Sequence, residues 1–313
     1  MTCEEWLLRR TFAGSSFDPE ALAATKAGTG TTVSVVLPAL NVEGTVGEIC
    51  ASIRERWTGR GGLVDELVVI DSRSSDATAR VAAEAGARVM QDDEIVATAG
   101  SAHGKGEALW KSLAATSGDV VVWIDSDIED FDPAFVPGLL APLLSDDRIG
   151  YVKALYRRPI GGRDGDGGRV TEICARPLIN RFFPDLAVFV QPLSGEAAGR
   201  RALLERVPFL TGYAVEIGLL IDILRLEGLE AMAQVDLGER RHANQPTAAL
   251  GRMAYEITHA VLARAGDRPI GADELHPYAR PVPCDDRYDL DRTPVPLIER
   301  PPMTGFTSAE RQR

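Results

Sequence analysis

Short runs of β-forming apolar residues alternate with longer amphipathic segments along the first half of the chain. This pattern predicts strands at Thr32–Leu37, where Pro38 ends the run, and at Glu66–Ile70, Ala87–Met90 and Asp119–Ile124. Helices are expected at residues 43–57, Asp76–Gly86, Lys105–Ala115 and Ala134–Leu144. Strands that alternate with helices of this length favour an α/β fold with a mostly parallel sheet, wound as in nucleotide-binding proteins.

The pattern is less regular after residue 150. Strands are expected at Ile149–Tyr156, Val188–Leu193 and Ala231–Leu237, and helices at Val170–Phe183, Val215–Glu227 and Thr247–Ala265. Five glycines within residues 159–168 predict a loop. We therefore expect four parts: a helical arm (1–30), an α/β part (31–150), a second, smaller part (151–266), and a tail (267–313) in which proline and charged residues favour an extended chain.

The overall charge limits the classes of partner. The chain has 313 residues, a net charge of -12 and a pI near 4.9, so it lacks the basic excess needed to bind nucleic acid or an anionic membrane. No signal peptide or membrane-span pattern is found, and four widely spaced cysteines match no zinc or redox motif. These features predict a cytoplasmic protein. Lysine occurs only at positions 26, 105, 111 and 153.

Two carboxylates follow the apolar run that ends at Ile124. Asp125 and Asp127 are two positions apart, so both would point to one side at the end of a strand, where α/β proteins bind ligands. Oxygen ligands of this kind suit Mg²⁺ or Mn²⁺, which commonly bridge to substrate phosphates. The alternative is an ordinary acidic turn after a strand.

Polar residues also follow the first two predicted strands, at Pro38–Glu43 and Asp71–Asp76. In a parallel sheet these ends share one edge, where they could bind a nucleobase and ribose. Capping of the next helix by Ser75 or Asp76 is the alternative, and it explains only part of the second run. His103-Gly104-Lys105-Gly106 precedes a helix and could approach a phosphate, although a loop with one solvated lysine is the simpler interpretation.

A second anion site is suggested near residue 169. Five arginines lie within residues 157–176, around the sequence Gly167-Gly168-Arg169-Val170-Thr171-Glu172. Guanidinium groups and backbone N–H groups after glycines can hold a phosphate or carboxylate, whereas a solvated charged loop is the alternative. His242 follows the last predicted strand and could bind a metal ion, although a lone histidine is more often structural.

Several motifs occur in a fixed order: PALN-x-E, DS-x-S-x-D, GKGE-x-LW, DSD, YRRP, GGRVTE, QPL-x-GE and GY-x-VEIGLL. From about residue 30 to 265, this ordered set resembles the glucosyl-3-phosphoglycerate and mannosyl-3-phosphoglycerate synthases of actinobacteria. These are retaining glycosyltransferases with the GT-A fold. The resemblance implies transfer of mannose or glucose from GDP-mannose or UDP-glucose to the 2-hydroxyl of D-3-phosphoglycerate. It makes residues 31–150 the nucleotide-sugar-binding part and 151–266 the acceptor-binding part, and it suggests a homodimer.

The resemblance also implies roles for individual residues. Asp127, Asp125 and His242 would bind Mg²⁺ or Mn²⁺, with Asp127 the direct ligand, and Asp127, Glu216 and Lys105 would be catalytic. The nucleotide-sugar contacts would be Pro38, Ala39, Leu40, Glu43, Ser72, Lys105, Asp125, Ser126, Leu193 and Tyr213. The acceptor contacts would be Gly168, Arg169, Thr171 and Asn244. The chain departs from the family pattern at Arg73, Ser194 and Ala197, where Gly, Gly and Tyr are expected.

Some alternatives stay open at this point. Glu216 could be a nucleophile or a structural carboxylate, and same-face attack is the favoured route to retention. A sugar-nucleotidyltransferase would carry a Gly-rich basic loop after the first strand, where Pro38-Ala39-Leu40-Asn41 stands instead. A lipid-phosphate glycosyltransferase would need a membrane anchor. A nucleotide-sugar-binding regulatory protein without catalysis would not need the intact carboxylate pair.

Overall fold

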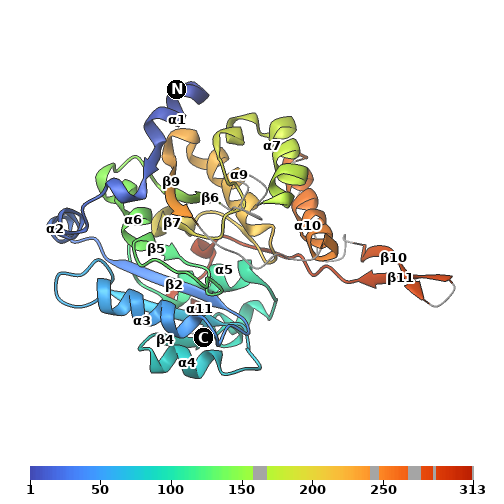
Figure 1. The fold of residues 1–313 in the computed structure, drawn as a ribbon, viewed down its shortest axis with the longest axis horizontal. Helices are drawn as coiled ribbons and strands as arrows, with labels where there is room; N and C mark the ends of the chain where they lie inside the picture. The colour runs from blue at the N-terminus through green and yellow to red at the C-terminus, as the bar shows by residue number, and fades with distance from the viewer. Residues whose placement is uncertain (158–167, 240–246, 267–275, 285–286, 312–313) are drawn as a thin grey trace.

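The chain folds around one mixed sheet with helices on both faces (Figure 1). The computed structural model describes residues 1–157, 168–239, 247–266, 276–284 and 287–311. The sheet has eight strands in the order β1-β9-β6-β7-β5-β2-β3-β4, and all run parallel except β7. The strands are β1 (Thr11–Ala13), β2 (Val33–Ala39), β3 (Glu66–Asp71), β4 (Arg88–Gln91), β5 (Val120–Trp123), β6 (Tyr151–Arg157), β7 (Ala197–Arg200) and β9 (Met232–Glu239).

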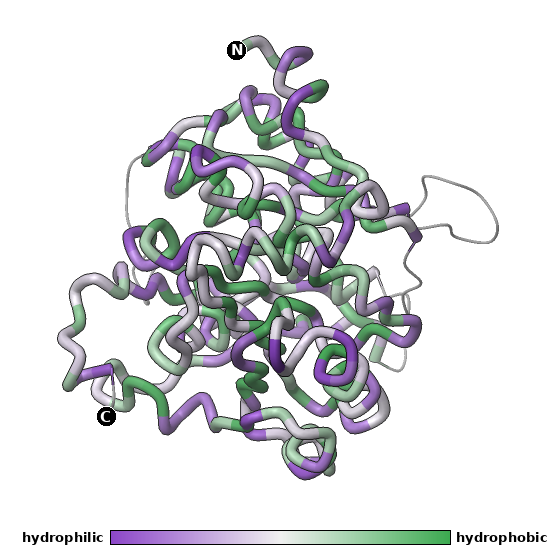
Figure 2. Tube along the Cα trace, turned by 90° about the vertical axis from the view of Figure 1, so that its left-hand side faces the viewer, coloured by the Kyte–Doolittle hydropathy of each residue, from purple (hydrophilic) through white to green (hydrophobic). Residues whose placement is uncertain are grey.

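Alternation along the strands creates two cores, one on each face of the sheet. Val36 and Val121 point to one face, and their neighbours Val35 and Val122 point to the other. Helices α1 (Cys3–Arg10), α5 (Lys105–Ala115), α7 (Arg176–Phe182), α9 (Val215–Glu227) and α10 (Thr247–Ala265) cover the first face. Helices α2 (Pro19–Thr29), α3 (Val46–Trp57), α4 (Thr78–Glu84) and α6 (Phe135–Ser145) cover the second. Figure 2 shows hydrophobic positions concentrated along the segments that cross the middle of the molecule.

Many predicted elements are confirmed, and α5, α9 and α10 have the predicted bounds. The prediction that Pro38 ends the first strand is wrong, because β2 continues to Ala39. Strand β2 pairs with β5 only as far as Val36. Pro38, which has no N–H, therefore does not have to donate a hydrogen bond to β5. The N-terminal arm is helical as expected in α1 and α2, but it also adds β1 to the sheet edge beside β9.

The strand predicted at Val188–Leu193 is wrong. Residues Pro184–Val188 form a 3₁₀ helix, and the strand that enters the sheet is β7, a few residues later. Prolines at 184 and 192 break an otherwise β-like sequence. Strand β7 reads Ala-Ala-Gly-Arg, whose small side chains give little β signal although its first three residues are buried.

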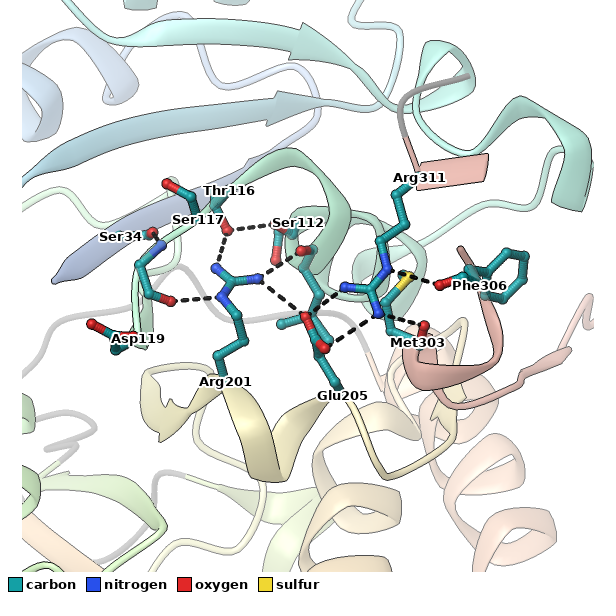
Figure 3. A network of polar contacts seen from close by, with 12 residues as sticks. Ser34, Ser112, Thr116, Ser117, Asp119, Arg201, Glu205, Met303, Phe306 and Arg311 are labelled. Atoms are coloured by element: carbon teal, nitrogen blue, oxygen red, sulfur yellow. Dashed lines mark hydrogen bonds and ion pairs between the residues drawn. The ribbon is translucent and has the colours of Figure 1, made fainter. Parts of the chain in front are cut away.

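The C-terminal residues return to the body of the protein. After the β10 (Tyr278–Cys284) and β11 (Arg287–Thr293) hairpin, which projects from the body in Figure 1, β12 (Glu299–Arg300) pairs with β8 (Phe209–Leu210). Met303 is buried in the core. Figure 3 shows how α11 (Ser308–Arg311) is attached to the body through Glu205. The Arg311 guanidinium lies 2.8 Å from the Glu205 carboxylate. The guanidinium of Arg201, from α8 (Arg201–Leu204), lies 3.6 Å from the same carboxylate. None of the described helices is long and apolar enough to span a membrane.

Candidate active site

The loops that follow β2 and β5 are joined by hydrogen bonds at the carboxyl edge of the sheet. Ser126 Oγ donates to the Pro38 carbonyl oxygen at 2.5 Å, and Thr45 Oγ1 donates to the Ser126 carbonyl oxygen at 2.6 Å. Two residues expected to contact the nucleotide sugar, Pro38 and Ser126, therefore lie together. Leu40 is more than half exposed at the same edge, whereas Ala39 is buried.

The loop after β3 is tied to the loop after β2. The buried Asp71 carboxylate accepts hydrogen bonds from Ser74 Oγ at 2.5 Å and from Gln91 Nε2 at 2.8 Å. Asn41 Oδ1 accepts from the Ser75 N–H at 2.8 Å. Asn41 and Arg73 have φ angles of 53° and 60°, a left-handed conformation that is costly for residues other than glycine. Strained backbone at two adjacent strand exits is typical of ligand-binding loops.

Helix capping explains part of these polar runs. Asp76 Oδ1 accepts hydrogen bonds from the Thr78 N–H and Oγ1, at 3.0 and 2.6 Å, at the start of α4. Glu43 Oε2 accepts from the Ala77 N–H at 2.8 Å, so this candidate nucleotide contact also closes the helix N-terminus. Ser72 is half-buried at the end of β3 and is not part of this cap.

Lys105 lies between two carboxylates that come from distant parts of the chain. Its Nζ is 2.5 Å from Asp125 Oδ1 after β5, 2.8 Å from Glu216 Oε1 in α9, and 3.0 Å from the Gly195 carbonyl oxygen. Burial lowers the pKa of Lys105, but the charges of Asp125 and Glu216 outweigh it and raise the pKa above its usual value. The interpretation of Lys105 as a solvated loop residue is therefore wrong.

Glu216 binds a second lysine. Its Oε2 contacts the Nζ of Lys153, a fully buried residue in the middle of β6. Burial lowers the pKa of Lys153, and the charge of Glu216 opposes this shift. Both carboxylate oxygens of Glu216 thus face an ammonium group. The scarcity of lysine made Lys153 visible in the sequence, but nothing local indicated that it meets Glu216, which is 63 residues away.

Two glycines allow this close packing. A Cβ atom at Gly195 would lie 1.9 Å from Asp125 Oδ2, and one at Gly104, which has a φ of 103°, would lie 2.8 Å from the Thr211 carbonyl oxygen. Any side chain at position 195 would displace the Asp125 carboxylate. Gly195 belongs to the QPL-x-GE motif, but its role was not predicted from the sequence, because that role depends on a contact with Asp125 in a distant part of the chain.

Asp127 and Tyr213 mark the exposed side of the site. Asp127 is exposed, and the Tyr213 side chain is about half exposed. The pKa of Tyr213 is raised by partial burial, with further contributions from the charges of Glu256 and Asp127. Leu193 is partly buried and packs against the hydrophobic core.

The two aspartates are suitable ligands for a hard divalent cation. Both supply carboxylate oxygens from one loop, and the exposure of Asp127 leaves room for water or phosphate ligands. Asp125 is also paired with Lys105. The described residues contain no cluster of three His, Cys, Asp or Glu side chains that could hold a metal ion. His242 and Asn244, expected to bind metal and acceptor, lie outside the described residues.

The other expected acceptor residues lie at the start of a helix. Gly168 has a φ of 91°, Arg169 is partly buried, and the buried Thr171 begins the π-helical turn Thr171–Ala175 that leads into α7. A Cβ atom at Gly168 would lie 3.6 Å from Thr171 Oγ1. Arg176, five residues after Thr171, is paired with Glu172 at 2.8 Å.

The fold and these strand-end carboxylates define a glycosyltransferase, and the model of the family described as glycosyl transferase family 2 matches residues 34–207. The chain is 43% identical to the glucosyl-3-phosphoglycerate synthase of Petrotoga mobilis over 95% of its length and 94% of that protein. The chain belongs to the glucosyl-/mannosyl-3-phosphoglycerate synthase family, which confirms the resemblance seen in the motifs.

Solved structures agree with this assignment. The mannosyl-3-phosphoglycerate synthase of Rubrobacter xylanophilus superposes with a TM-score of 0.88 at 42% identity, covering 96% of this chain and 99% of that one. The glucosyl-3-phosphoglycerate synthase of Mycobacterium tuberculosis, in complex with Mn²⁺, UDP-glucose and phosphoglyceric acid, superposes with a TM-score of 0.80 at 44% identity, covering 92% and 95%. Another structure of the mycobacterial enzyme holds Mg²⁺ and UDP. The expected GT-A-type fold is confirmed.

Proposed function

We propose that this protein transfers a hexose from UDP-glucose or GDP-mannose to the 2-hydroxyl of D-3-phosphoglycerate, with retention of configuration. The observation that carries the proposal is the contact of Lys105 with Asp125 at the carboxyl edge of the sheet, beside the exposed Asp127. A cation and two carboxylates at this edge support the binding of a sugar diphosphate there. The ligands of the mycobacterial relative, UDP-glucose and phosphoglyceric acid, support the choice of substrates.

Each group has a distinct task in this reaction. A divalent cation held by Asp127 and Asp125, with His242, would neutralise the charge that develops on the departing diphosphate. Lys105 adds a positive charge beside the same leaving group. Arg169 and Thr171 would hold the phosphate of the acceptor and so orient its 2-hydroxyl toward the anomeric carbon.

The position of Glu216 favours same-face attack over a covalent sugar intermediate. Both of its oxygens contact lysine ammonium groups, and its side chain is only 7% exposed. A carboxylate shared by two cations is a weak nucleophile, because attack would remove charge from both ion pairs. The departing phosphate oxygen would then accept the acceptor proton, and Glu216 would serve as a counter-ion.

Release of UDP or GDP tests the proposal. Release from the matching sugar nucleotide should require both a divalent metal and 3-phosphoglycerate, and removal of metal with a chelator should stop it.

Asp127→Ala should abolish turnover, and Arg169→Ala should mainly raise the KM for 3-phosphoglycerate. Nucleotide-sugar binding without release would support the regulatory alternative, and full activity after demetallation would contradict the metal role. An unchanged acceptor KM would reject the phosphate role of Arg169.

We also propose a homodimer in the cytoplasm. The β10–β11 hairpin projects from the body (Figure 1) and exposes Tyr288 and Leu290. A two-stranded hairpin is only marginally stable alone, so a second copy of the chain is a reasonable support for it. The four cysteines are free thiols, which fits a reducing compartment. Sedimentation of the purified protein and fractionation of the producing cells test these two points.

A further inference from the structure

Lys153, Glu216, Lys105 and Asp125 form a continuous chain of alternating charges from the core to the site. Lys153 is fully buried in β6 and contacts Glu216 Oε2. Lys105 Nζ lies 2.8 Å from the other oxygen of Glu216 and 2.5 Å from Asp125 Oδ1. The chain therefore connects a residue with no access to solvent to one of the two candidate metal ligands.

A lysine at this position is costly for the fold. Position 153 lies between Ala197 of β7 and Gln234 of β9 in the sheet register, and an apolar side chain could occupy it without desolvating a charge. Buried ion pairs are often no more stabilising than well-packed apolar residues of similar volume. The fold alone therefore gives little reason for Lys153, and a reason in the chemistry of the site is more informative.

The charges of the cluster suggest that reason. The charges of Glu216 and Glu196 act on both Lys105 and Lys153, and the charge of Asp125 acts on Lys105; Glu196 is fully buried. Without Lys153, Lys105 would be the one ammonium group in contact with Glu216 among the described residues, and Glu216 would attract it away from Asp125.

We propose that Lys153 is a positioning residue: it neutralises one side of Glu216, so that Lys105 remains shared between Glu216 and Asp125 and can face the diphosphate. Lys153 itself touches no substrate. The effect on turnover depends on the proposed hexosyl transfer, whereas the effect on metal binding does not. Removing the charge of Lys153 and removing the charge of Glu216 should therefore change the affinity for the metal ion in opposite directions.

Binding of Mn²⁺ to the full-length protein without nucleotide, followed by electron paramagnetic resonance, provides the first measurement. Lys153→Met removes a positive charge, so we expect Mn²⁺ to bind about three- to tenfold more tightly. Glu216→Gln removes a negative charge and should weaken binding by a similar factor, about three- to tenfold. Lys153→Arg keeps the charge and should bind Mn²⁺ like the unchanged protein. Shifts of the same sign in Lys153→Met and Glu216→Gln would overturn the proposal.

Steady-state kinetics provide the second measurement. In Lys153→Met, kcat should fall by about tenfold or more, with the KM for 3-phosphoglycerate little changed, because Lys105 is displaced from the leaving group. Lys153→Arg should recover most of kcat. An unchanged kcat in Lys153→Met would reject the positioning role. If neither the unchanged protein nor any variant transfers hexose, the proposed function is wrong. The Mn²⁺ measurement would still test the positioning role of Lys153.

Two controls separate this role from a loss of folding. Lys111 is also a buried lysine, paired with the Glu107 carboxylate at 3.3 Å. That pair is separate from the charge chain of Lys153, Glu216, Lys105 and Asp125. Lys111→Met should lower stability and leave Mn²⁺ affinity unchanged. If Lys153→Met does not fold, the double variant Lys153→Met/Glu216→Gln removes both charges together. It should fold, bind Mn²⁺ with nearly unchanged affinity and have a reduced kcat, and an unchanged kcat there would also reject the proposal.

Discussion

At the residue scale, the site depends on close packing of its charged side chains against each other and against the backbone. Lys105 Nζ accommodates two carboxylates and the Gly195 carbonyl oxygen at 2.5 to 3.0 Å, and the Asp125 carboxylate lies directly against the Gly195 backbone. The position of Asp125 is therefore set by a residue with no side chain. Catalysis that relies on positioned charges is sensitive to displacements of this size.

Gly195→Ala should inactivate the enzyme while leaving it folded. The added Cβ would lie 1.9 Å from Asp125 Oδ2, so the carboxylate must move and the contact with Lys105 must change. We expect kcat/KM to fall by about 10²-fold, as for a misplacement of about 1 Å, with little change in the thermal unfolding midpoint. Gly28→Ala, at a position in α2 with nothing within 4 Å of the new Cβ, is the matched control and should keep full activity. An active Gly195→Ala protein would show that the position of Asp125 is not critical.

At the element scale, helix α5 carries Lys105 and is held in place by the C-terminal segment. Arg300 of β12 forms two contacts with the fully buried Glu107 of α5, at 2.7 and 2.8 Å, and donates to the Gly100 carbonyl oxygen at 3.0 Å. Its guanidinium also lies 5.2 Å from the centre of the Trp110 ring. The last part of the chain is therefore a structural support for the helix that begins at the candidate diphosphate site.

Arg300→Met should destabilise the protein strongly. In the part of the chain that the structure describes, it leaves the buried Glu107 with Lys111 as its remaining cation, and breaking a buried pair of this kind costs about 3 kcal/mol or more. Urea unfolding followed by circular dichroism measures the loss. Arg80→Met removes an exposed pair with Glu84, on α4, and should change stability by less than about 0.5 kcal/mol. Equal effects of the two substitutions would mean that the C-terminal segment does not support α5.

The sequence predicted elements well where periodicity is strong and poorly where contacts from other segments decide. Helices α5, α9 and α10 have clear apolar spacing and were predicted with the correct bounds. Strand β7 reads Ala-Ala-Gly-Arg and becomes a strand because β5 and β6 pair with it on both sides, which no local signal shows. The same holds for β1 and β12, whose partners β9 and β8 are distant in sequence.

At the scale of the whole molecule, the candidate site is an edge where separate parts of the chain meet. Motifs that lie within one loop, such as Asp125 and Asp127, could be found from the sequence because their spacing has a local meaning. The Lys105–Glu216 and Lys153–Glu216 contacts could not, because they depend on how α9 packs across the sheet. Membership of the family places these motifs in one fold, and the geometry then adds the buried charge chain.

The β10–β11 hairpin should be the contact between two copies of the chain. Its two seven-residue strands pair only with each other among the described strands, and Tyr288 and Leu290 are 74% and 45% exposed. Apolar side chains on a projecting hairpin are costly to leave in water, and a second molecule would cover them. Tyr288→Glu/Leu290→Glu should therefore convert a dimer into a monomer in sedimentation velocity. Leu8→Glu alters a leucine of α1 that is 84% exposed, and it should leave the assembly unchanged. A monomeric unaltered protein, or a dimer that survives both charges on the hairpin, would place the contact elsewhere.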